Sequence, residues 1–249
     1  MFQRDFQHIQ TIEELTLNAW PALQQVIYDG WVIRFANGYT RRSNSVTPLS
    51  TGTIDVRDKV RFCQEFYRSK GLPTVFKLTS ASQPPGLDAA LAGAGFHSTS
   101  GAIIKTAQLG LIPTTSDLRV IEAQPDRWVE SLAHLGYVAP KHMETLRAIV
   151  EAIALPRHLA LLVEGRQVIA SGLAVRQGTW LGLFDIATAV RFRRQGFGSA
   201  IVSSLLEWGK SHGAQSAYLQ VVTDNQPARA MYEKLGFKEA YEYEYWQRD

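Results

Sequence analysis

The sequence is poor in cysteine, since Cys63 is the only one among 249 residues. A lone cysteine excludes an intramolecular disulfide, and no group of cysteines and histidines has the spacing of a zinc site. We therefore expect no bound metal. Cys63 lies in a helix-like run from Val60 to Phe66, where a buried and inert thiol is the favoured interpretation.

Long apolar runs are also missing. No stretch approaches the roughly 18 uninterrupted apolar residues that cross a bilayer, and the segment from Met1 to Phe6 has no apolar core of the kind that a secretion signal needs. Hydrophobic residues nevertheless make up 45% of the chain and charged residues 20%, which is enough apolar material for a packed core. We expect a soluble, cytoplasmic protein that has no membrane partner.

The excess of positive charge is small. There are 26 lysines and arginines against 23 aspartates and glutamates, a formal net charge of +3. Nucleic-acid-binding proteins normally concentrate basic residues on one face, so we expect no nucleic-acid partner. A small anionic ligand is compatible with this charge, and the oligomeric state stays open.

The C-terminal half alternates between helical and strand-like patterns. Short turns separate three apolar runs, which indicates neighbouring antiparallel strands. Gly213 and Gly236 are natural helix ends, and Pro227 suits a first helical turn. The pattern predicts two helices, over 126–137 and 141–154, and then three antiparallel strands, over 158–164, 168–175 and 179–187. A helix that contains Ile201 to Trp208 and ends at Gly213 follows, and then a strand over 217–222, a helix over 227–235 and a strand over 241–246.

The N-terminal half follows a similar order. It predicts a helix over 12–27 broken near Trp20 and Pro21, strands over 31–36 and 44–49, a helix over 57–69 and a strand over 74–78. The segment from Gly86 to Phe96 then matches Pro227 to Phe237, and both end in Gly-Phe. This repetition suggests an old duplication; the alternative is a coincidence between two common helix endings. We expect an N-terminal domain over 1–112, a linker from Gly110 to Ser116, and a second domain over 117–249.

The segment from Asp185 to Ala200 carries the clearest chemistry. A strand runs into a turn rich in arginine and glycine, which then opens a helix. The first amides of a helix have no partners within it, and together with the helix dipole they attract anions. Gly196 and Gly198 allow the backbone to approach a diphosphate closely. Three arginines add positive charge there, namely Arg191, Arg193 and Arg194. The pattern indicates a site for a nucleotide-like diphosphate.

Two other glycine-rich phosphate motifs are excluded. A P-loop needs Gly-Lys-Ser or Gly-Lys-Thr, and neither occurs in the sequence. A dinucleotide fingerprint needs a third small residue near position 201, where Ile201 stands, and it follows a parallel strand rather than a hairpin.

Two segments resemble the signatures of the GNAT superfamily of N-acetyltransferases. The run Arg193–Gly198 resembles the Arg/Gln-x-x-Gly-x-Gly/Ala pyrophosphate loop, and Asn225–Phe237 resembles Asn-x-x-Ala-x-x-x-Tyr-x-x-x-Gly-Phe. The resemblance covers Leu118 to the C-terminus, and the N-terminal half only as a degenerate copy. It implies an α/β (α+β) fold of two GNAT-like units in tandem, each a mixed, mainly antiparallel sheet flanked by helices.

The resemblance also implies acetyl-CoA as co-substrate and a role for each matching residue. The pantetheine arm would pair with the end of a splayed strand, and Asn225 would bond that arm or the opposite strand. Ala228 would keep its helix close to the CoA. Tyr232 would protonate the departing thiolate, because a phenol pKa near 10 lies close to that of an alkyl thiol. The residues assigned to the strand end are Ile186, Ala187 and Thr188, and those assigned to the phosphates are Arg193, Arg194, Gln195, Gly196, Phe197, Gly198 and Ser199.

The implied activity is transfer of acetyl directly to a primary amine of a small-molecule or peptide acceptor. The general base is open: Asp185 is a candidate, although a strand-end aspartate facing solvent is an equal alternative, and Glu164 is a second candidate. Taken singly, Tyr232 could be a packed structural residue and Asn225 an ordinary helix cap. Two rival functions also stay open, a non-catalytic acyl-CoA sensor and a transferase for a longer acyl group.

The N-terminal copy departs from the family pattern. Where its phosphate loop should lie, residues 51–58 carry two aspartates and no paired glycines, and Leu91 stands at the tyrosine position. This half should therefore not bind acetyl-CoA in the family's manner. We expect it to pack against the active half and to shape the acceptor site. Residues that could reach an acceptor from there, or be structural, are Trp31, Arg34, Tyr39, Arg41 and Arg42.

Overall fold

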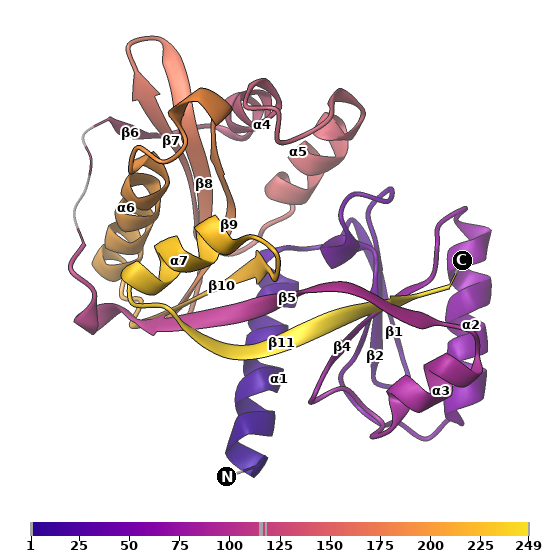
Figure 1. Cartoon of the computed structure of the whole chain (residues 1–249). Coiled ribbons are helices and arrows are strands. Elements are labelled where there is room, and N and C mark those ends of the chain that lie inside the picture. The colour runs from indigo at the N-terminus through magenta and orange to yellow at the C-terminus, as the bar shows by residue number, and fades with distance from the viewer. Residues whose placement is uncertain (1, 115–116, 118, 249) are drawn as a thin grey trace. The chain divides into compact units, whose positions relative to one another are not determined.

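The computed structural model describes residues 2–114, 117 and 119–248. Within these residues the chain forms seven α-helices and one mixed sheet of eleven strands (Figure 1). The strand order is β1-β2-β3-β4-β11-β5-β10-β9-β8-β7-β6. The expected α+β class is confirmed. The expectation of a separate sheet in each half differs from the structure, because the strands of both halves belong to a single sheet.

The chain divides into two compact units that are discontinuous in sequence. Unit 1 contains Met1–Glu14, Ala22–Ile103 and Tyr241–Asp249, and unit 2 contains Leu15–Pro21 and Ile104–Ala240. The domain ranges 1–112 and 117–249 therefore stay a proposal about where two sequence copies meet. Thr115 and Ser116 of the expected linker, and Leu118, lie outside the described residues.

The strands of unit 1 form a largely antiparallel arrangement. They are β1 (Gln24–Tyr28), β2 (Trp31–Phe35), β3 (Val46–Pro48) and β4 (Val75–Thr79). β1, β2 and β3 pair antiparallel, and β4 is parallel to β3. The far edge of β4 is covered by the last strand of the chain, in which Tyr243–Gln247 pairs antiparallel with Val75–Thr79.

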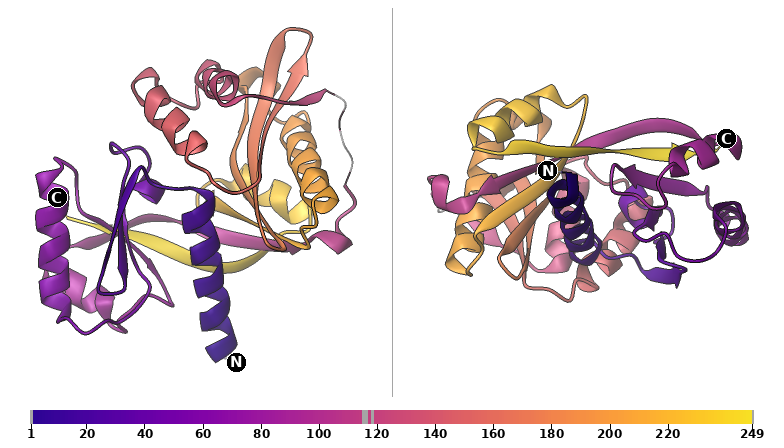
Figure 2. Two further views of the ribbon diagram at one scale, coloured as in Figure 1. Left: turned by 180° about the vertical axis from the view of Figure 1, so that it is seen from behind. Right: turned by 90° about the horizontal axis from the view of Figure 1, so that it is seen from below.

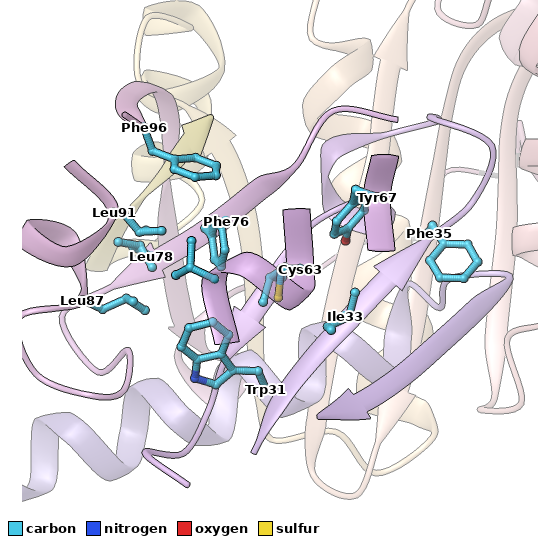
Figure 3. Close-up of a cluster of buried hydrophobic side chains, with 12 residues drawn as sticks. Trp31, Ile33, Phe35, Cys63, Tyr67, Phe76, Leu78, Leu87, Leu91 and Phe96 are labelled. Atoms are coloured by element: carbon cyan, nitrogen blue, oxygen red, sulfur yellow. The ribbon is translucent and has the colours of Figure 1, made fainter. Parts of the chain in front are cut away.

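Helices α2 (Val56–Ser69) and α3 (Leu87–Gly93) complete the core of unit 1. Val60, Cys63 and Tyr67 are buried on one face of α2 at the spacing expected for helical periodicity. They pack with aromatic and aliphatic side chains from β2, β4 and α3 (Figure 3). Cys63 is fully buried, which confirms the interpretation of its thiol as a core group.

Unit 2 contains the predicted three antiparallel strands. These are β7 (Arg157–Glu164), β8 (Gln167–Gln177) and β9 (Trp180–Thr188), with β6 (Val120–Glu122) beside β7. β6, β7, β8 and β9 pair antiparallel, whereas β10 (Ser216–Val222) is parallel to β9. The short β6 was not expected from the sequence.

Four helices belong to unit 2, namely α4 (Pro125–His134), α5 (Met143–Glu151), α6 (Phe197–Ser211) and α7 (Gln226–Lys234). α6 covers one face of strands β7–β9, and α4 and α5 lie on the other (Figure 2). Gly209 of α6 approaches the sheet so closely that a Cβ there would lie 2.4 Å from the side chain of Leu181. From the opposite face, the Trp128 indole donates a hydrogen bond of 3.2 Å to the carbonyl of Gly172.

Two long strands contribute residues to both units. β5 (His97–Gln108) begins in unit 1 and ends in unit 2, and β11 (Lys238–Gln247) does the reverse. In the strand order, β5 from the N-terminal half is next to β10, and β11 from the C-terminal half is next to β4. The two sequence halves therefore exchange their last strands.

The boundaries of the first helix differ from the expectation. α1 spans Phe2–Ala19, and the residues after Pro21 form β1, so the predicted helix over 12–27 is wrong beyond Ala19. Pro21 cannot continue a helix, and Gln24–Tyr28 follow the strand pairing of Trp31–Phe35. Among the described residues, no helix combines the length and the apolar character needed to cross a bilayer.

Candidate active site

The end of β9 carries a β-bulge. Phe184 pairs with Leu173 and Ala187 with Ser171, so two residues of β9, Asp185 and Ile186, stand opposite the single residue between them on β8. Asp185 has a φ of 47°, in the left-handed region. A bulge of this kind bends its strand and redirects the residues that follow it.

Strands β9 and β10 pair over only part of their length. The printed register runs from Trp180 with Ser216 to Leu183 with Leu219, whereas β9 continues to Thr188 and β10 to Val222. Beyond the bulge, the end of β9 therefore presents an edge that β10 does not cover within this register. An extended ligand arm could pair with such an edge in the manner of an added strand.

The turn after β9 leads into α6 through two left-handed residues. Arg194 has a φ of 64° and Gly196 a φ of 87°. Gly196 is the N-cap of α6, and it makes no side-chain cap hydrogen bond. The first amides of α6 are thus not used by a capping side chain, and residues 193–196 are exposed. This is the local arrangement that suits an anion.

The arginines of this turn differ in their contacts. The Arg193 Nε donates to the carbonyl of Thr188 at 3.3 Å, which ties the turn to the end of β9. Arg191 lies over the Phe192 ring at 4.8 Å, and its carbonyl accepts a hydrogen bond from the Gln195 side-chain Nε2. Arg194 is exposed. The turn therefore combines fixed backbone with positive charge at the surface.

Three of the predicted elements meet at Gly198. A Cβ on Gly198 would lie 3.1 Å from the Met231 Sδ of α7 and 3.6 Å from the Thr188 Oγ1 of β9. The structure thus brings the strand end, the start of α6 and the middle of α7 together. Because 3.1 Å is closer than most Cβ contacts, glycine at this position is explained by packing.

Asn225 is the N-cap of α7. Its side-chain oxygen accepts a hydrogen bond of 3.3 Å from the backbone amide of Ala228. This is the capping interpretation, in which the side chain satisfies one of the unpaired amides of the first turn. Asn225 is exposed and Ala228 is half-buried.

Tyr232 is the buried residue of α7, with 6% of its surface exposed. Its ring makes an edge contact with Phe237 at 5.9 Å between centroids, and the Phe237 amide donates to the Tyr232 carbonyl at 3.0 Å. Burial raises the pKa of the Tyr232 phenol well above its usual value near 10, and the neighbouring Tyr137 raises it further. The phenol therefore carries its proton throughout the physiological pH range.

The two general-base candidates lie in different surroundings. Asp185 is 9% exposed and sits in the bulge of β9, so the alternative of a solvent-facing aspartate is wrong. Glu164 ends β7 beside the β7–β8 turn, where its side chain is 59% exposed and 4.0 Å from Arg119. Of the two, only Asp185 lies next to the strand end, Ile186–Thr188, that the resemblance assigns to the cofactor.

Comparison with known proteins decides the family. The family model described as "Probable histone acetyltransferase Rv0428c C-terminal" matches residues 7–246. The chain belongs to this family. It is a GNAT-fold N-acetyltransferase, as the two sequence signatures predicted.

Several known proteins are similar to this chain over most of its length. The uncharacterized N-acetyltransferase YobR of Bacillus subtilis is 29% identical over 243 residues, which cover 95% of this chain and 97% of that protein. A GCN5-related N-acetyltransferase from Kribbella flavida has a similar structure, with a TM-score of 0.70 at 14% identity over 96% of this chain and 95% of that one. A tandem GNAT protein from the clavulanic acid biosynthesis pathway matches with a TM-score of 0.58 at 13% identity, over 77% and 68% of the two chains.

The N-terminal half of this acetyltransferase fills its corresponding helix start with carboxylates. Asp55 is the N-cap of α2 and accepts from the Arg57 amide at 2.8 Å. Asp29 accepts from the amides of Thr53 and Ile54, each at 2.9 Å, and these bonds lower its pKa to about 2. The amides of Thr53 and Ile54, in the loop before α2, and of Arg57, in its first turn, therefore already have anionic partners.

Three of the residues suggested for acceptor contact, Trp31, Arg34 and Arg41, make contacts within unit 1. Trp31 is fully buried, and its indole donates to the Gln83 carbonyl. Arg34 is 2% exposed, and one of its guanidinium nitrogens donates to the Arg42 carbonyl at 3.0 Å. Arg41 lies over the Tyr245 ring at 5.4 Å.

Gly172 was not predicted as part of the site, although it lies opposite the bulge of β9. A Cβ on Gly172 would lie 2.7 Å from the Ile186 side chain and 2.8 Å from that of Leu205. A glycine inside a strand often marks a bulge or a close approach, so its place between Ser171 and Leu173 was a readable signal.

Proposed function

We propose that this chain binds acetyl-CoA along the free end of β9 and at the start of α6, and transfers the acetyl group to a primary amine. The observation that carries the proposal is the N-terminus of α6, where the N-cap residue makes no side-chain hydrogen bond to the first amides. This helix start adjoins the bulged strand end, where Gly198 lies beside Thr188. Membership of a GNAT family supports acetyl-CoA as the acyl donor.

The residues present fit this co-substrate. The amides of residues 194–199 would hold the two linked phosphates; residues 194–196 are exposed and residues 197–199 are half-buried. Arg193 and Arg194 would supply positive charge beside them. The backbone of Ile186, Ala187 and Thr188 would pair with the pantetheine arm, because β10 does not cover that edge in the register. Ala228, half-buried in the first turn of α7, would let that helix lie close to the arm.

Bound acetyl-CoA supplies a thioester whose carbonyl carbon accepts the amine nitrogen. Tyr232 holds a proton on its phenol oxygen. It would either donate a hydrogen bond to the departing sulfur or transfer the proton to it. Burial makes Tyr232 a weaker acid than a free phenol. A hydrogen bond that strengthens as the sulfur becomes negative is therefore its main contribution.

The acceptor amine must lose a proton before or during its attack. Asp185 is the carboxylate that we assign to this step, because it is buried at the strand end where the reacting carbonyl would lie. Asn225 holds α7 through its cap and thereby serves the helix that carries Tyr232.

The carboxylates Asp29 and Asp55 are the basis for assigning different roles to the two sequence halves. We propose residues 117–249 as the catalytic copy and residues 1–112 as a degenerate copy, whose helix start is occupied by Asp29 and Asp55. The family description names histones for its Mycobacterium tuberculosis member. Lysine-bearing peptides therefore belong beside small amines among the acceptors to be tested.

Turnover tests this proposal. Purified protein is given acetyl-CoA with a panel of small amines, amino acids and lysine-bearing peptides, and free CoA thiol is measured. We expect thiol release with at least one acceptor and a loss of about 100-fold in kcat for Tyr232→Phe. Acetyl-CoA binding without turnover across the panel would favour the sensor, and a preference for longer acyl-CoA would favour the alternative transferase.

A further inference from the structure

Lys105 is a fully buried lysine in β5, the strand that the N-terminal half contributes. Its side chain has no exposed surface, and its Nζ lies 2.8 Å from the Glu233 Oε1 of α7. The same ammonium lies 3.5 Å from the Glu239 Oε1 of β11. All three residues belong to unit 2.

A buried ammonium needs anionic partners, because removal from water is unfavourable unless charge and hydrogen bonds replace the lost hydration. Glu233 and Glu239 supply them from side chains that are 56% and 47% exposed. The hydrogen bond from Lys105 is the largest cause of the lowered pKa of Glu233. The fixed lysine therefore holds a carboxylate that would otherwise be mobile at the surface.

The ion pairs continue through α7. Arg229 donates to the Glu239 Oε1 at 3.0 Å, and its other terminal nitrogen donates to the Thr223 carbonyl at 3.1 Å. The charges thus join β5 to α7, α7 to β11, and α7 to the loop before it. Together with the Asn225 cap, they hold α7 from its first turn to its last.

Tyr232 immediately precedes Glu233, so the position of its side chain depends on how these ion pairs hold α7. Among the described residues, the ring contact with Phe237 holds the phenol, and no hydrogen bond fixes its hydroxyl. The direction of the hydroxyl is therefore set by where α7 lies. A shift of about 1 Å in a catalytic group can lower a rate by about 100-fold.

We propose that Lys105 is a positioning residue, which holds α7 through Glu233 so that the Tyr232 hydroxyl faces the leaving sulfur. This rests on the proposed function of Tyr232. It gives the strand from the N-terminal half a direct part in the reaction of the C-terminal half.

A double-mutant cycle tests the inference on the full chain. Glu233→Gln keeps the shape of an exposed side chain but removes the charge that Lys105 holds. We expect it to lower kcat about fivefold, and to change the KM for acetyl-CoA less than about twofold. In the Tyr232→Phe background the same substitution should leave kcat within about 1.5-fold, because there is no hydroxyl left to misplace.

Two further variants act on the lysine itself. Lys105→Met removes the charge at similar length, and we expect it to lower kcat about tenfold. Lys105→Arg restores a cation, and we expect it to keep kcat within about threefold of the wild type. If Lys105→Met does not fold, as judged by its thermal transition, the Glu233→Gln cycle alone decides.

The outcomes separate the two proposals. An equal loss from Glu233→Gln in both backgrounds, or no loss in the wild type, overturns the positioning role while Tyr232 keeps its own. Unchanged turnover in Tyr232→Phe alone overturns the proposed general acid, and the positioning role with it. Asp58→Asn removes the exposed pair with Arg61 in α2 and serves as the matched control, for which we expect unchanged kcat.

Discussion

Gly198, in the first turn of α6, lies beside Thr188 at the end of β9: a Cβ on Gly198 would be in van der Waals contact with the threonine hydroxyl, at 3.6 Å. They are ten positions apart in the sequence, and the hydrogen bond from Arg193 to the Thr188 carbonyl folds the intervening turn back. A ligand whose phosphates lie on the first amides of α6 therefore has its remaining arm beside the end of β9.

Gly196→Val should abolish acetyl-CoA binding. The φ of Gly196 is 87° and a Cβ there meets no atom within 4 Å, so backbone strain and obstruction of the ligand are the only costs. We expect a loss of stability of about 1–3 kcal/mol and at least a hundredfold weaker binding by calorimetry.

Gly213→Val is the matched control, because Gly213 has a φ of 88° and equally open surroundings at the other end of α6. It should show the same loss of stability and normal binding. Normal acetyl-CoA binding by Gly196→Val would remove this turn from the cofactor site.

The rate should not fall on the alkaline side through titration of Tyr232. Burial raises its pKa above 10, so the protonated form persists and kcat should stay level from pH 8 to pH 10. The check is kcat against pH at saturating acetyl-CoA, for the wild type and Tyr232→Phe. A decline in kcat centred at or below pH 10 that disappears in the variant would show an ordinary or lowered pKa instead.

The two site motifs were readable because each is short and local. The turn before α6 and the cap of α7 depend on residues within about 13 positions, and glycines with positive φ and an N-cap asparagine have direct sequence signals. The structure places both motifs where the pattern predicts, at the start of α6 and over α7.

Pairing between distant strands was not readable. β5 carries serine, threonine and glycine at its start and a lysine among apolar residues, and its neighbours in the sheet, β10 and β11, lie more than 100 residues away. Local patterns do not specify such partners, so the exchange of last strands was missed. The sequence did contain a signal for Lys105, because a lysine within an apolar run needs an anionic partner when it is buried.

His158 should make the protein less stable below neutral pH. Its ring stacks on Trp208 at 5.3 Å, and burial lowers its pKa below 6.5 despite the opposing effect of Glu122. The unfolded chain therefore binds the proton first, and the stability contribution is present above pH 6.5 and declines as the pH falls.

The measurement for His158 is the unfolding free energy in urea at pH 7.5 and pH 5. His158→Gln should reduce the difference between the two values, whereas His134→Gln, at an exposed position of α4, should leave it as in the wild type. An equal difference in all three proteins would contradict the assignment.

Cys63 should resist alkylation in the native protein. It is fully buried in the core of unit 1, and burial raises the pKa of its thiol to about 12. Because the thiolate is the reactive form, iodoacetamide at pH 8 should modify it at least tenfold more slowly in buffer than in urea, as followed by mass spectrometry. Equal rates would place the thiol at the surface.

A crystal structure with acetyl-CoA bound would show whether the start of α6 holds the phosphates. We expect the two linked phosphates on the amides of residues 194–199, the pantetheine arm along Ile186–Thr188, and the thioester sulfur within hydrogen-bond reach of the Tyr232 hydroxyl. Acetyl-CoA bound elsewhere on the chain, with the start of α6 free of phosphate, would contradict the proposed binding site.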